Sequence, residues 1–460
     1  MKRRTFAKNI TLSTGLAGIT FLEACNGNLD TKGQKASKSK EYEISKDLSE
    51  RMYAHALEIT KSKIRGGDSE VFFKKPFIDA AFNKNIFLWD TCLMCCFAKY
   101  HLDELPVYQA LDNFYGRMEE DGFICREYKQ TGEPLWPKDH PVSINPPLLA
   151  FAELEIFGVS KDTDRLKKVY PILKNNFQFH VNTYMMDDHL FYGDTMGLGM
   201  DNMPREPRGW EPTEGNGWSQ HELGLQLAAL KKTDEEKLNF FVTEYVNTRN
   251  GVWNKQGRQV DFSSQMAMYA LQLKEIAELI GREEDIGLYT ELHAKIKKAL
   301  NDLTWNEEDS FYYDLGYNKQ INRRHIGMYW ALLAKVVPDD RLEGFLGHLL
   351  NPDEFYRKTP LPALSASDED YVGWGDYWLG GVWAPTVYMV LKGLSAYGKE
   401  DLARHLAAKV YASVTEVFVA TGTFWENYSP DLISYGMPSK KDFCGWTALI
   451  PISIYREYIL

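Results

Sequence analysis

The sequence predicts an all-α protein in which about six helical hairpins form a closed ring. Apolar residues recur with helical spacing through most of the 460 residues. The helical segments are roughly 10 to 22 residues long and come in pairs, and no strong repeat of fixed length indicates an open solenoid. Strand candidates are short and lie only in connections, at 251–260 and 310–317. The loops between helices are therefore expected to form a funnel at one end of the ring.

The expected helices follow the 3.6-residue period of apolar side chains along the chain. This spacing occurs in the segments 48–64, 145–158, 164–184, 263–281, 283–305, 323–337, 341–350, 383–398 and 400–422. Gly281, Pro338 and Gly398 stand at segment ends, where glycine and proline stop helices. This pattern places one large helical domain at 46–460.

The first residues predict export from the cytoplasm. Residues 1–24 begin with the basic head KRRTFAK, which contains Arg3 and Arg4, and continue with a mildly apolar run. This order resembles a twin-arginine export signal. The run ends at LEAC, which resembles the box where a bacterial lipoprotein is cut and acylated on its new amino-terminal cysteine, here Cys25.

The same segment bears on the membrane and on localisation. A membrane-spanning anchor is the alternative interpretation, but the apolar run is shorter than the roughly 20 residues that a bilayer requires. Residues 25–45 are rich in Asn, Gly, Ser and Lys and suit a flexible tether. The mature protein is expected in the periplasm, or at the outer membrane or surface, of a Gram-negative-type bacterium, with a lipid at Cys25 as its only link to the membrane.

The composition excludes some classes of partner. The formal net charge of -11 argues against nucleic acid, since phosphate binding requires a basic face. Cys92, Cys95 and Cys96 lie in an apolar run without a second Cys or His cluster, so they are expected to be small core residues rather than zinc ligands. Neither a metal nor an organic cofactor is expected. The 12 Trp and 26 Tyr residues suit sugar stacking but are equally ordinary core material.

The chemistry is expected in loops that interrupt the helical pattern. Four of them mix tryptophan, glycine, proline and carboxylates: FLWDT (87–91), GMDNMPREPRGW (199–210), GWGDYWLGGVWAP (373–385) and TFWENYSPD (423–431). A fifth, HPVSINPP (140–147), is polar and ends at prolines that can open a helix. Asp201 and Glu426 are flanked by glycines or aromatics. Hydrolysis of a glycosidic bond requires two such groups, an acid for the leaving oxygen and a carboxylate that activates water or attacks the sugar.

Each of these residues also has an ordinary structural interpretation. Asp201 before Asn202 is compatible with an Asx turn or a helix cap, and Glu426 with a solvated loop acid. Trp89 and Asp90 are compatible with a buried tryptophan beside a helix cap. The set taken together favours chemistry.

Six segments in matching order, between about residues 80 and 450, resemble a known family. GMDNMPR resembles the corresponding loop of glycoside hydrolase family 63 and of mannosylglycerate-hydrolase-like enzymes, and FWENYSP resembles their FWENYxP loop. DYWLGGVWAPTVYMVLKGL is similar to their YWRGPIWxP segment and to a trehalase motif. VDFSSQMAMYALQLKEIAELIG, FLWDT and INPPLLA are similar to further family segments. The resemblance implies an (α/α)6 barrel of the trehalase-like clan.

The resemblance implies roles for individual residues. Asp201 takes the position of the general acid and Glu426 that of the general base, which gives hydrolysis with inversion and carboxyl groups roughly 6.5 to 9.5 Å apart. Arg205 matches an arginine beside the acid. The residues expected to contact the substrate are Trp89, Asp90, Asn145, Arg205, Trp210, Trp378, Trp383 and Trp425. Asn145 replaces the family's Gln and Leu379 its Arg, so the substrate is not carried over.

The leading hypothesis is an exported, inverting, exo-acting α-glycosidase that removes a terminal sugar from an oligosaccharide or a small glycoside. Three alternatives stay open: a uronate-directed hydrolase or lyase on a similar toroid, a non-catalytic surface glycan-binding lipoprotein, and a helical scaffold for protein partners. A binding protein would keep the tryptophans without needing either acid, and a scaffold would present an exposed apolar groove. The position of Asp201 and Glu426 across one pocket discriminates among them.

Overall fold

The computed structural model describes residues 44–66, 73, 75–80, 85–205, 233–249 and 256–460. Residues 42–460 form one compact unit. The predicted export signal, Cys25, nearly all of the tether and Trp210 lie outside the described residues. Among the helices that are described, none has the length and apolar character needed to cross a membrane.

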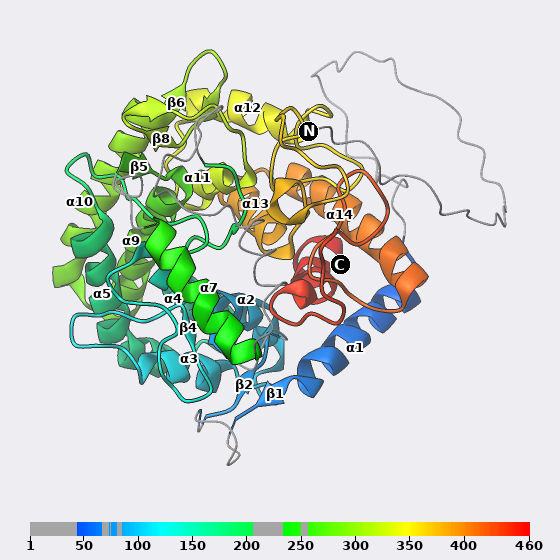
Figure 1. Cartoon of the computed structure of the whole chain (residues 1–460), viewed down its shortest axis with the longest axis horizontal. Coiled ribbons are helices and arrows are strands. Elements are labelled where there is room, and N and C mark those ends of the chain that lie inside the picture. Colours follow the sequence, from blue (N-terminus) through cyan, green and yellow to red (C-terminus); the bar gives the residue numbers. More distant parts are fainter. Residues whose placement is uncertain (1–43, 67–72, 74, 81–84, 206–232, 250–255) are drawn as a thin grey trace. The chain divides into compact units, whose positions relative to one another are not determined.

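Inner and outer helices alternate along the chain. The inner helices are α2 (Leu88–Ala98), α4 (Leu149–Ser160), α9 (Val260–Ile280), α11 (Trp330–Leu333), α13 (Ala384–Ala396) and the C-terminal helical segment η9 (Ile450–Ile459). Each inner helix contacts the next, and η9 contacts α2, so the inner ring closes. The outer helices are α1 (Lys46–Ser62), α3 (Val107–Tyr115), α5 (Thr163–Tyr184), α10 (Glu283–Ala299), α12 (Asp339–Gly347) and α14 (Glu400–Thr421), which surround the inner ones in Figure 1.

Burial explains which helices lie inside. Every residue of α2 is buried, and α9 buries most of its length. The outer helix α10, in contrast, buries only Tyr289, Ile296 and Ala299 and carries acidic residues in its first turn and lysines in its last. A helix that is apolar on all sides needs protein around it, whereas an amphipathic one covers the core with a single face. The ring is thus a consequence of two kinds of helix.

The predicted helices agree with the structure at 48–64, 164–184, 263–281, 283–305, 341–350, 383–398 and 400–422, within a few residues at each end. The prediction for 323–337 was too long, because only η5 (Ile326–Tyr329) and α11 are helical there. Arg323 pairs instead with Asp368 and Asp370. The helix expected from 145 begins only at Leu149.

In the described part of the chain, the helices α2, α3, α7 (Asp234–Arg249) and η9 were not predicted. FLWDT was expected to be an interhelical loop, but the structure places its last four residues in the first turn of α2. Periodicity fails for α2 because a helix buried on every side shows no apolar stripe. α7 lies outside the alternation and packs Phe241 against Trp136, with ring centroids 6.2 Å apart.

The strands are short and antiparallel, and they connect the helices. β1 (Ile64–Arg65) pairs with β2 (Phe77–Ile78), β3 (Ile86–Phe87) with β4 (Glu127–Tyr128), and β6 (Trp305–Asn306) with β7 (Phe311–Tyr312); β8 (Leu315–Gly316) lies between β5 (Gly257–Arg258) and β9 (Lys319–Gln320). The candidate at 310–317 holds β7 and β8, and the described end of 251–260 holds β5. Short 3-10 or π-helical turns are η2 (Lys99–His101), η3 (Pro141–Ser143), η4 (Leu300–Thr304), η6 (His348–Leu350), η7 (Tyr377–Leu379) and η8 (Thr447–Leu449).

Cys92, Cys95 and Cys96 are core residues, as predicted. Cys92, Cys95 and Cys96 are buried in α2 with free thiols, and Cys125 and Cys444 are also buried and free. Burial raises the pKa of the Cys92 thiol well above its ordinary value, which keeps it neutral and unreactive. Within the described residues, no group of His, Cys, Asp and Glu side chains is arranged to hold a metal ion.

Candidate active site

The predicted site residues collect where the inner helices begin. Trp89 and Asp90 stand in the first turn of α2, and Trp383 immediately precedes α13. Asn145 lies four residues before α4. Helix N-termini carry partial positive charge and unpaired backbone N–H groups, which favour carboxylates and polar ligands. The ring therefore directs several such termini toward one group of loops.

Asp201 lies half-buried on a loop that the backbone holds from both sides. Upstream, the Asp194 carboxylate accepts hydrogen bonds from the N–H groups of Met196 (2.9 Å) and Gly197 (3.2 Å). Gly199 has φ +80°, and a Cβ there would lie 3.2 Å from the Trp89 ring, so both its conformation and its space require glycine. This geometry explains the glycine in the GMD sequence.

The pKa of Asp201 is raised to about 6, chiefly by burial. The charge of Arg126 opposes that rise, while the charges of Asp194 and Glu127 add to it. A carboxylic acid with a pKa in this range keeps a sizeable protonated fraction near neutral pH and can donate a proton. Asp201 is thus electrostatically suited to acid chemistry.

Glu426 is buried, and its pKa is raised to about 7, again chiefly by burial. The charge of Lys440 and the Lys440 N–H, which donates to Oε2 at 3.0 Å, both lower it. The Tyr377 hydroxyl donates a long hydrogen bond of 3.4 Å to Oε1 and lowers it further, whereas the charge of Asp201 raises it. This carboxyl group changes its protonation state near neutral pH.

The charges of Asp201 and Glu426 both act on the hydroxyl group of Tyr377. The charge of Asp201 raises the pKa of Glu426, and after burial the charges of Asp201, Glu426 and Asp90 are the next largest causes of the raised pKa of Tyr377. The charges of three carboxyl groups thus act on one tyrosine hydroxyl, and one of the three, Glu426, is hydrogen-bonded to it. Burial raises the pKa of Asp90 well above its ordinary value. The two acids predicted from separate loops are therefore brought together, as the hydrolase hypothesis requires.

Three polar atoms at this site are buried and have no hydrogen-bond partner within the described part of the chain: the indole nitrogens of Trp89 and Trp383 and Oδ1 of Asp90. Buried polar groups in folded proteins are nearly always paired, and an unpaired one indicates strain or a ligand. Gly445 makes room beside Asp90, because a Cβ on it would lie 2.2 Å from Asp90 Oδ1. Donors and an acceptor of this kind match the hydroxyl groups of a sugar.

The tryptophans predicted to line the pocket pack mainly against other aromatic rings. Trp378 and Trp383 stack with centroids 4.1 Å apart and planes 5° apart, and both rings are fully buried. Trp425 is half-buried and stacks on Tyr435 at 3.7 Å, while its indole N–H donates to Thr421. The structure gives Trp378 and Trp425 packing roles, and their contact with a sugar stays a prediction.

Two other predicted residues bridge protein segments. Asn145 accepts from the Trp89 N–H at 3.1 Å and donates to the Gly197 carbonyl at 3.3 Å, which ties α2 to the Asp201 loop. Arg205 was expected beside the acid, but its buried guanidinium donates to Asp261 and Asp314. The arginine whose charge lowers the pKa of Asp201 is Arg126. Burial of a guanidinium requires carboxylate partners, and the starts of α9 and β8 supply them.

Five residues that act on the two acids were not predicted: Asp194, Arg126, Glu127, Tyr377 and Lys440. Tyr377 stood within the quoted GWGDYWLGG segment, beside the tryptophan that was chosen. Arg126 and Glu127 follow an apolar stretch that sequence periodicity does not distinguish, and Lys440 is one of two adjacent lysines. Their charges matter only because folding brings them near Asp201 and Glu426.

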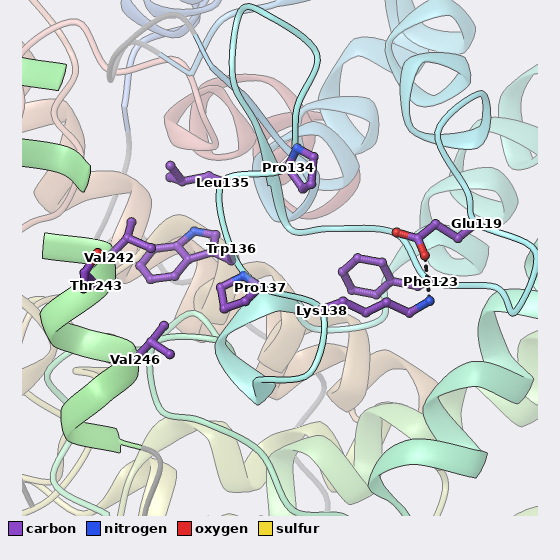
Figure 2. A pocket seen from close by; sticks show the side chains of 10 residues that line it. All are labelled: Glu119, Phe123, Pro134, Leu135, Trp136, Pro137, Lys138, Val242, Thr243 and Val246. Carbon is purple, nitrogen blue, oxygen red and sulfur yellow. Dashed lines mark hydrogen bonds and ion pairs between the residues drawn. The ribbon is translucent and has the colours of Figure 1, made fainter. Parts of the chain in front are cut away.

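A separate cavity of about 490 Å³ lies between α7 and residues 119–138 (Figure 2). Val242 and Val246 of α7 line one side, and Phe123 and Lys138 the other. Trp136 forms part of its wall and donates its indole N–H to Glu127 at 3.1 Å. Trp136 thus connects this cavity to Glu127, whose charge raises the pKa of Asp201.

Known proteins resemble this chain over most of its length. The model of the mannosylglycerate hydrolase MGH1-like glycoside hydrolase domain matches residues 111–438. A probable mannosyl-oligosaccharide glucosidase of Schizosaccharomyces pombe is 30% identical over 217 residues, which are 43% of this chain and 26% of that protein.

Solved structures extend the similarity to the fold. The family 63 mannosylglycerate hydrolase of Thermus thermophilus, in complex with glucose, has a TM-score of 0.67 at 17% identity and covers 87% of this chain and 99% of its own. The neutral trehalase of Saccharomyces cerevisiae has a TM-score of 0.58 at 14% identity, over 83% of this chain and 74% of its own. These neighbours confirm the predicted (α/α)6 barrel.

Proposed function

We propose an activity from one premise: the chain belongs to the mannosylglycerate hydrolase MGH1-like family of glycoside hydrolases and is itself a glycoside hydrolase. The proposed reaction is removal of a terminal sugar from an oligosaccharide or small glycoside, by cleavage of an α-glycosidic bond with inversion at the anomeric carbon. The enzyme class excludes the scaffold and the purely sugar-binding alternatives. The proposal concerns the α-linkage of the bond, the removal of the sugar from the end of the substrate, and the inversion at the anomeric carbon.

In the proposed mechanism, Asp201 donates its proton to the glycosidic oxygen as the bond to the anomeric carbon breaks. Glu426 removes a proton from a water molecule, which attacks that carbon from the opposite face. The observation that carries this assignment is that the charge of Asp201 raises the pKa of Glu426, and that the two pKa values of about 6 and about 7 both lie near neutrality. Inversion requires a carboxyl separation of roughly 6.5 to 9.5 Å, which leaves room for the water.

The two pKa values set the order of protonation. The productive state holds one proton on Asp201 and none on Glu426, although Glu426 has the higher pKa. One shared proton is present between about pH 6 and about pH 7, and part of that population carries it on Asp201. A bound sugar whose hydroxyl donates to Glu426, or which covers Asp201, would increase the fraction of molecules that carry the proton on Asp201.

The terminal-sugar assignment is supported by the buried polar atoms around the two acids. The unpaired indole N–H groups of Trp89 and Trp383 would donate to sugar oxygens, and Asp90 would accept from a sugar hydroxyl. These groups lie among buried side chains, which suits an enclosed site for one sugar more than a groove along a polymer. Mannosides and glucosides are the first candidates, because the similar proteins are named for mannosylglycerate and for a mannosyl-oligosaccharide glucosidase activity.

The decisive experiment is proton NMR of the sugar released by residues 26–460 from a panel of α- and β-linked glucosides, mannosides, galactosides and uronides. Release of the β-anomer from one α-glycoside is the expected result. Asp201→Asn and Glu426→Gln should abolish turnover with unchanged thermal unfolding, while the exposed control Glu133→Gln should keep it. Release of the α-anomer first, or normal rates in either acid variant, would overturn the mechanism.

Export and lipidation form a separate part of the proposal. A twin-arginine signal would carry the chain across the inner membrane, and acylation of Cys25 would then anchor it. Radiolabelled palmitate should enter the full-length protein produced in a Gram-negative host and should not enter the Cys25→Ser variant. Equal labelling of both proteins would exclude Cys25 as the acylated residue.

A further inference from the structure

The backbone at Asp376 and Tyr377 adopts a conformation that their side chains disfavour. Asp376 has φ 39° and Tyr377 has φ 63°, so two consecutive non-glycine residues occupy the left-handed region. Such residues need support from their surroundings, and they are enriched at functional sites. Tyr377 is the residue whose hydroxyl bonds Glu426 and lies within the fields of Asp201 and Asp90.

The support comes from the Asp201 loop. The Asn202 amide nitrogen donates to the Asp376 carbonyl at 3.0 Å, and the Asn202 amide oxygen accepts from the Trp378 N–H at 2.8 Å. One side chain thus spans the peptide groups on both sides of Tyr377. Since Asn202 directly follows Asp201 in the chain, the same four atoms join the segment that carries the acid to the residue that bonds the base.

We propose that Asn202 is a positioning residue: its amide holds the strained turn at Asp376 and Tyr377 and thereby keeps the Tyr377 hydroxyl on Glu426. The Tyr377 ring is held from a second side by Trp383, edge-on with centroids 4.9 Å apart and planes at 85°. Tyr377 therefore has two supports: Trp383 contacts its aromatic ring, and Asn202 fixes its backbone. This inference rests on the proposed role of Glu426 as the base.

Loss of the clamp should affect Glu426 in one direction. The groups that act on this carboxyl are Lys440, Asp201, Asp90 and Tyr377. The Tyr377 hydroxyl donates to Glu426 and stabilises its ionised form, so a displaced Tyr377 leaves the pKa of Glu426 higher. Since Glu426 has the higher pKa of the two acids, its titration sets the basic limb of the pH–rate profile, and this limb should move to higher pH while the maximal rate falls.

The test is a double-mutant cycle with Asn202→Ala, Tyr377→Phe and the combined variant. Asn202→Ala should lower kcat/KM by about tenfold or more, mainly through kcat, and move the basic limb to higher pH. Tyr377→Phe should move it in the same direction, and the combination should add little, because both changes remove one interaction. Shifts that add fully, or a pH profile of Asn202→Ala that matches the wild type, would overturn the proposal.

Two further variants separate positioning from general stability. Asn176 is buried in α5, donates to the Gly122 carbonyl at 3.0 Å and accepts from Tyr269 at 3.4 Å, so Asn176→Ala loses similar bonds and should leave the pH profile unchanged. Asn202→Ala with Asp376→Gly relieves the backbone strain. It should recover thermal stability without recovering the pH profile. Recovery of both would show that Asn202 acts only through stability.

A second readout does not depend on turnover. With ¹³C-labelled glutamate, the carboxyl signal missing from Glu426→Gln identifies Glu426, and its titration should shift upward in Asn202→Ala. If this signal shifts but the protein has no glycosidase activity, the clamp is supported and the proposed reaction is refuted. If the signal does not shift in an active enzyme, the clamp is refuted and the proposed reaction stands.

Discussion

Replacement of Arg205 by methionine tests the support of the Asp201 loop most directly. Methionine keeps the aliphatic stem of the side chain and removes the guanidinium. In the structure, that guanidinium bonds both oxygens of Asp261 and one oxygen of Asp314, and all three side chains are at most 4% exposed. The variant would leave two buried carboxylates without their cation.

The magnitude follows from that geometry. Removal of one partner from a buried ion pair costs about 3–5 kcal/mol, because the remaining charge stays desolvated. His325 keeps one contact with Asp314 at 3.2 Å, and Val260 donates its N–H to Asp314 at 2.7 Å. These contacts offset part of the loss at Asp314. We therefore expect a decrease of about 3 kcal/mol in the free energy of unfolding at neutral pH.

The sign of the pH dependence gives a second check. Burial raises the pKa of Asp314, but Arg205 and His325 outweigh it, so the folded-state pKa lies below the ordinary value. That depressed pKa contributes stability above the unfolded value of about 3.9, and the contribution is lost as pH falls through the folded value. In Arg205→Met the pKa of this carboxyl rises. The difference between wild type and variant should thus shrink toward acid pH.

Urea unfolding at about pH 7 and about pH 5 measures both effects. Arg282→Met is the matched control, because Arg282 pairs with Glu284 at 3.2 Å with both side chains more than half exposed, and it should cost less than about 1 kcal/mol. A loss below about 1 kcal/mol in Arg205→Met, or a loss that grows toward acid pH, would contradict the role given to this ion pair.

Three further predictions concern the site itself. The pH–rate profile should be bell-shaped between about pH 6 and about pH 7, from Asp201 and Glu426, and a plateau extending to strongly acid pH would contradict it. Lys440→Met removes a charge that lowers the pKa of Glu426, so the basic limb should move to higher pH and the maximal rate should fall; movement of that limb to lower pH would reject the assignment of the base. Gly445→Ala places a Cβ 2.2 Å from Asp90 Oδ1, so steady-state kinetics should show kcat/KM falling by about tenfold or more, and unchanged kinetics would separate Asp90 from the sugar site.

The proposed clamp at Asn202 changes how the two acids are understood. They come from segments more than 200 residues apart in the sequence, yet the Asn202 amide and the Tyr377 hydroxyl link them through a short chain of hydrogen bonds. A hydrolase that inverts configuration requires its acid and base at a set separation. A clamp between their loops is a direct way to maintain that separation.

The helical fold class and most outer helices follow from the order of residues alone, and the same order marks Asp201 and Glu426 as candidate acids. Amphipathic helices such as α5 and α14 show a periodic pattern because one face meets the core and the other meets water. Asp201 and Glu426 stood out because carboxylates among glycines, prolines and tryptophans fit neither a helix nor a core. The family resemblance of six segments added the (α/α)6 barrel, which the comparison with known structures confirmed.

Which charges act on those two carboxyl groups depends on the folded arrangement of the chain. Arg205 was expected beside Asp201, but the charge that lowers the pKa of Asp201 comes from Arg126, and Arg205 bonds Asp261 and Asp314 instead. The helix α2 escaped prediction for a related reason, since a segment buried on every side has no polar face to mark it. Electrostatic effects and complete burial depend on distances between segments remote in the chain, and the order of residues does not contain those distances.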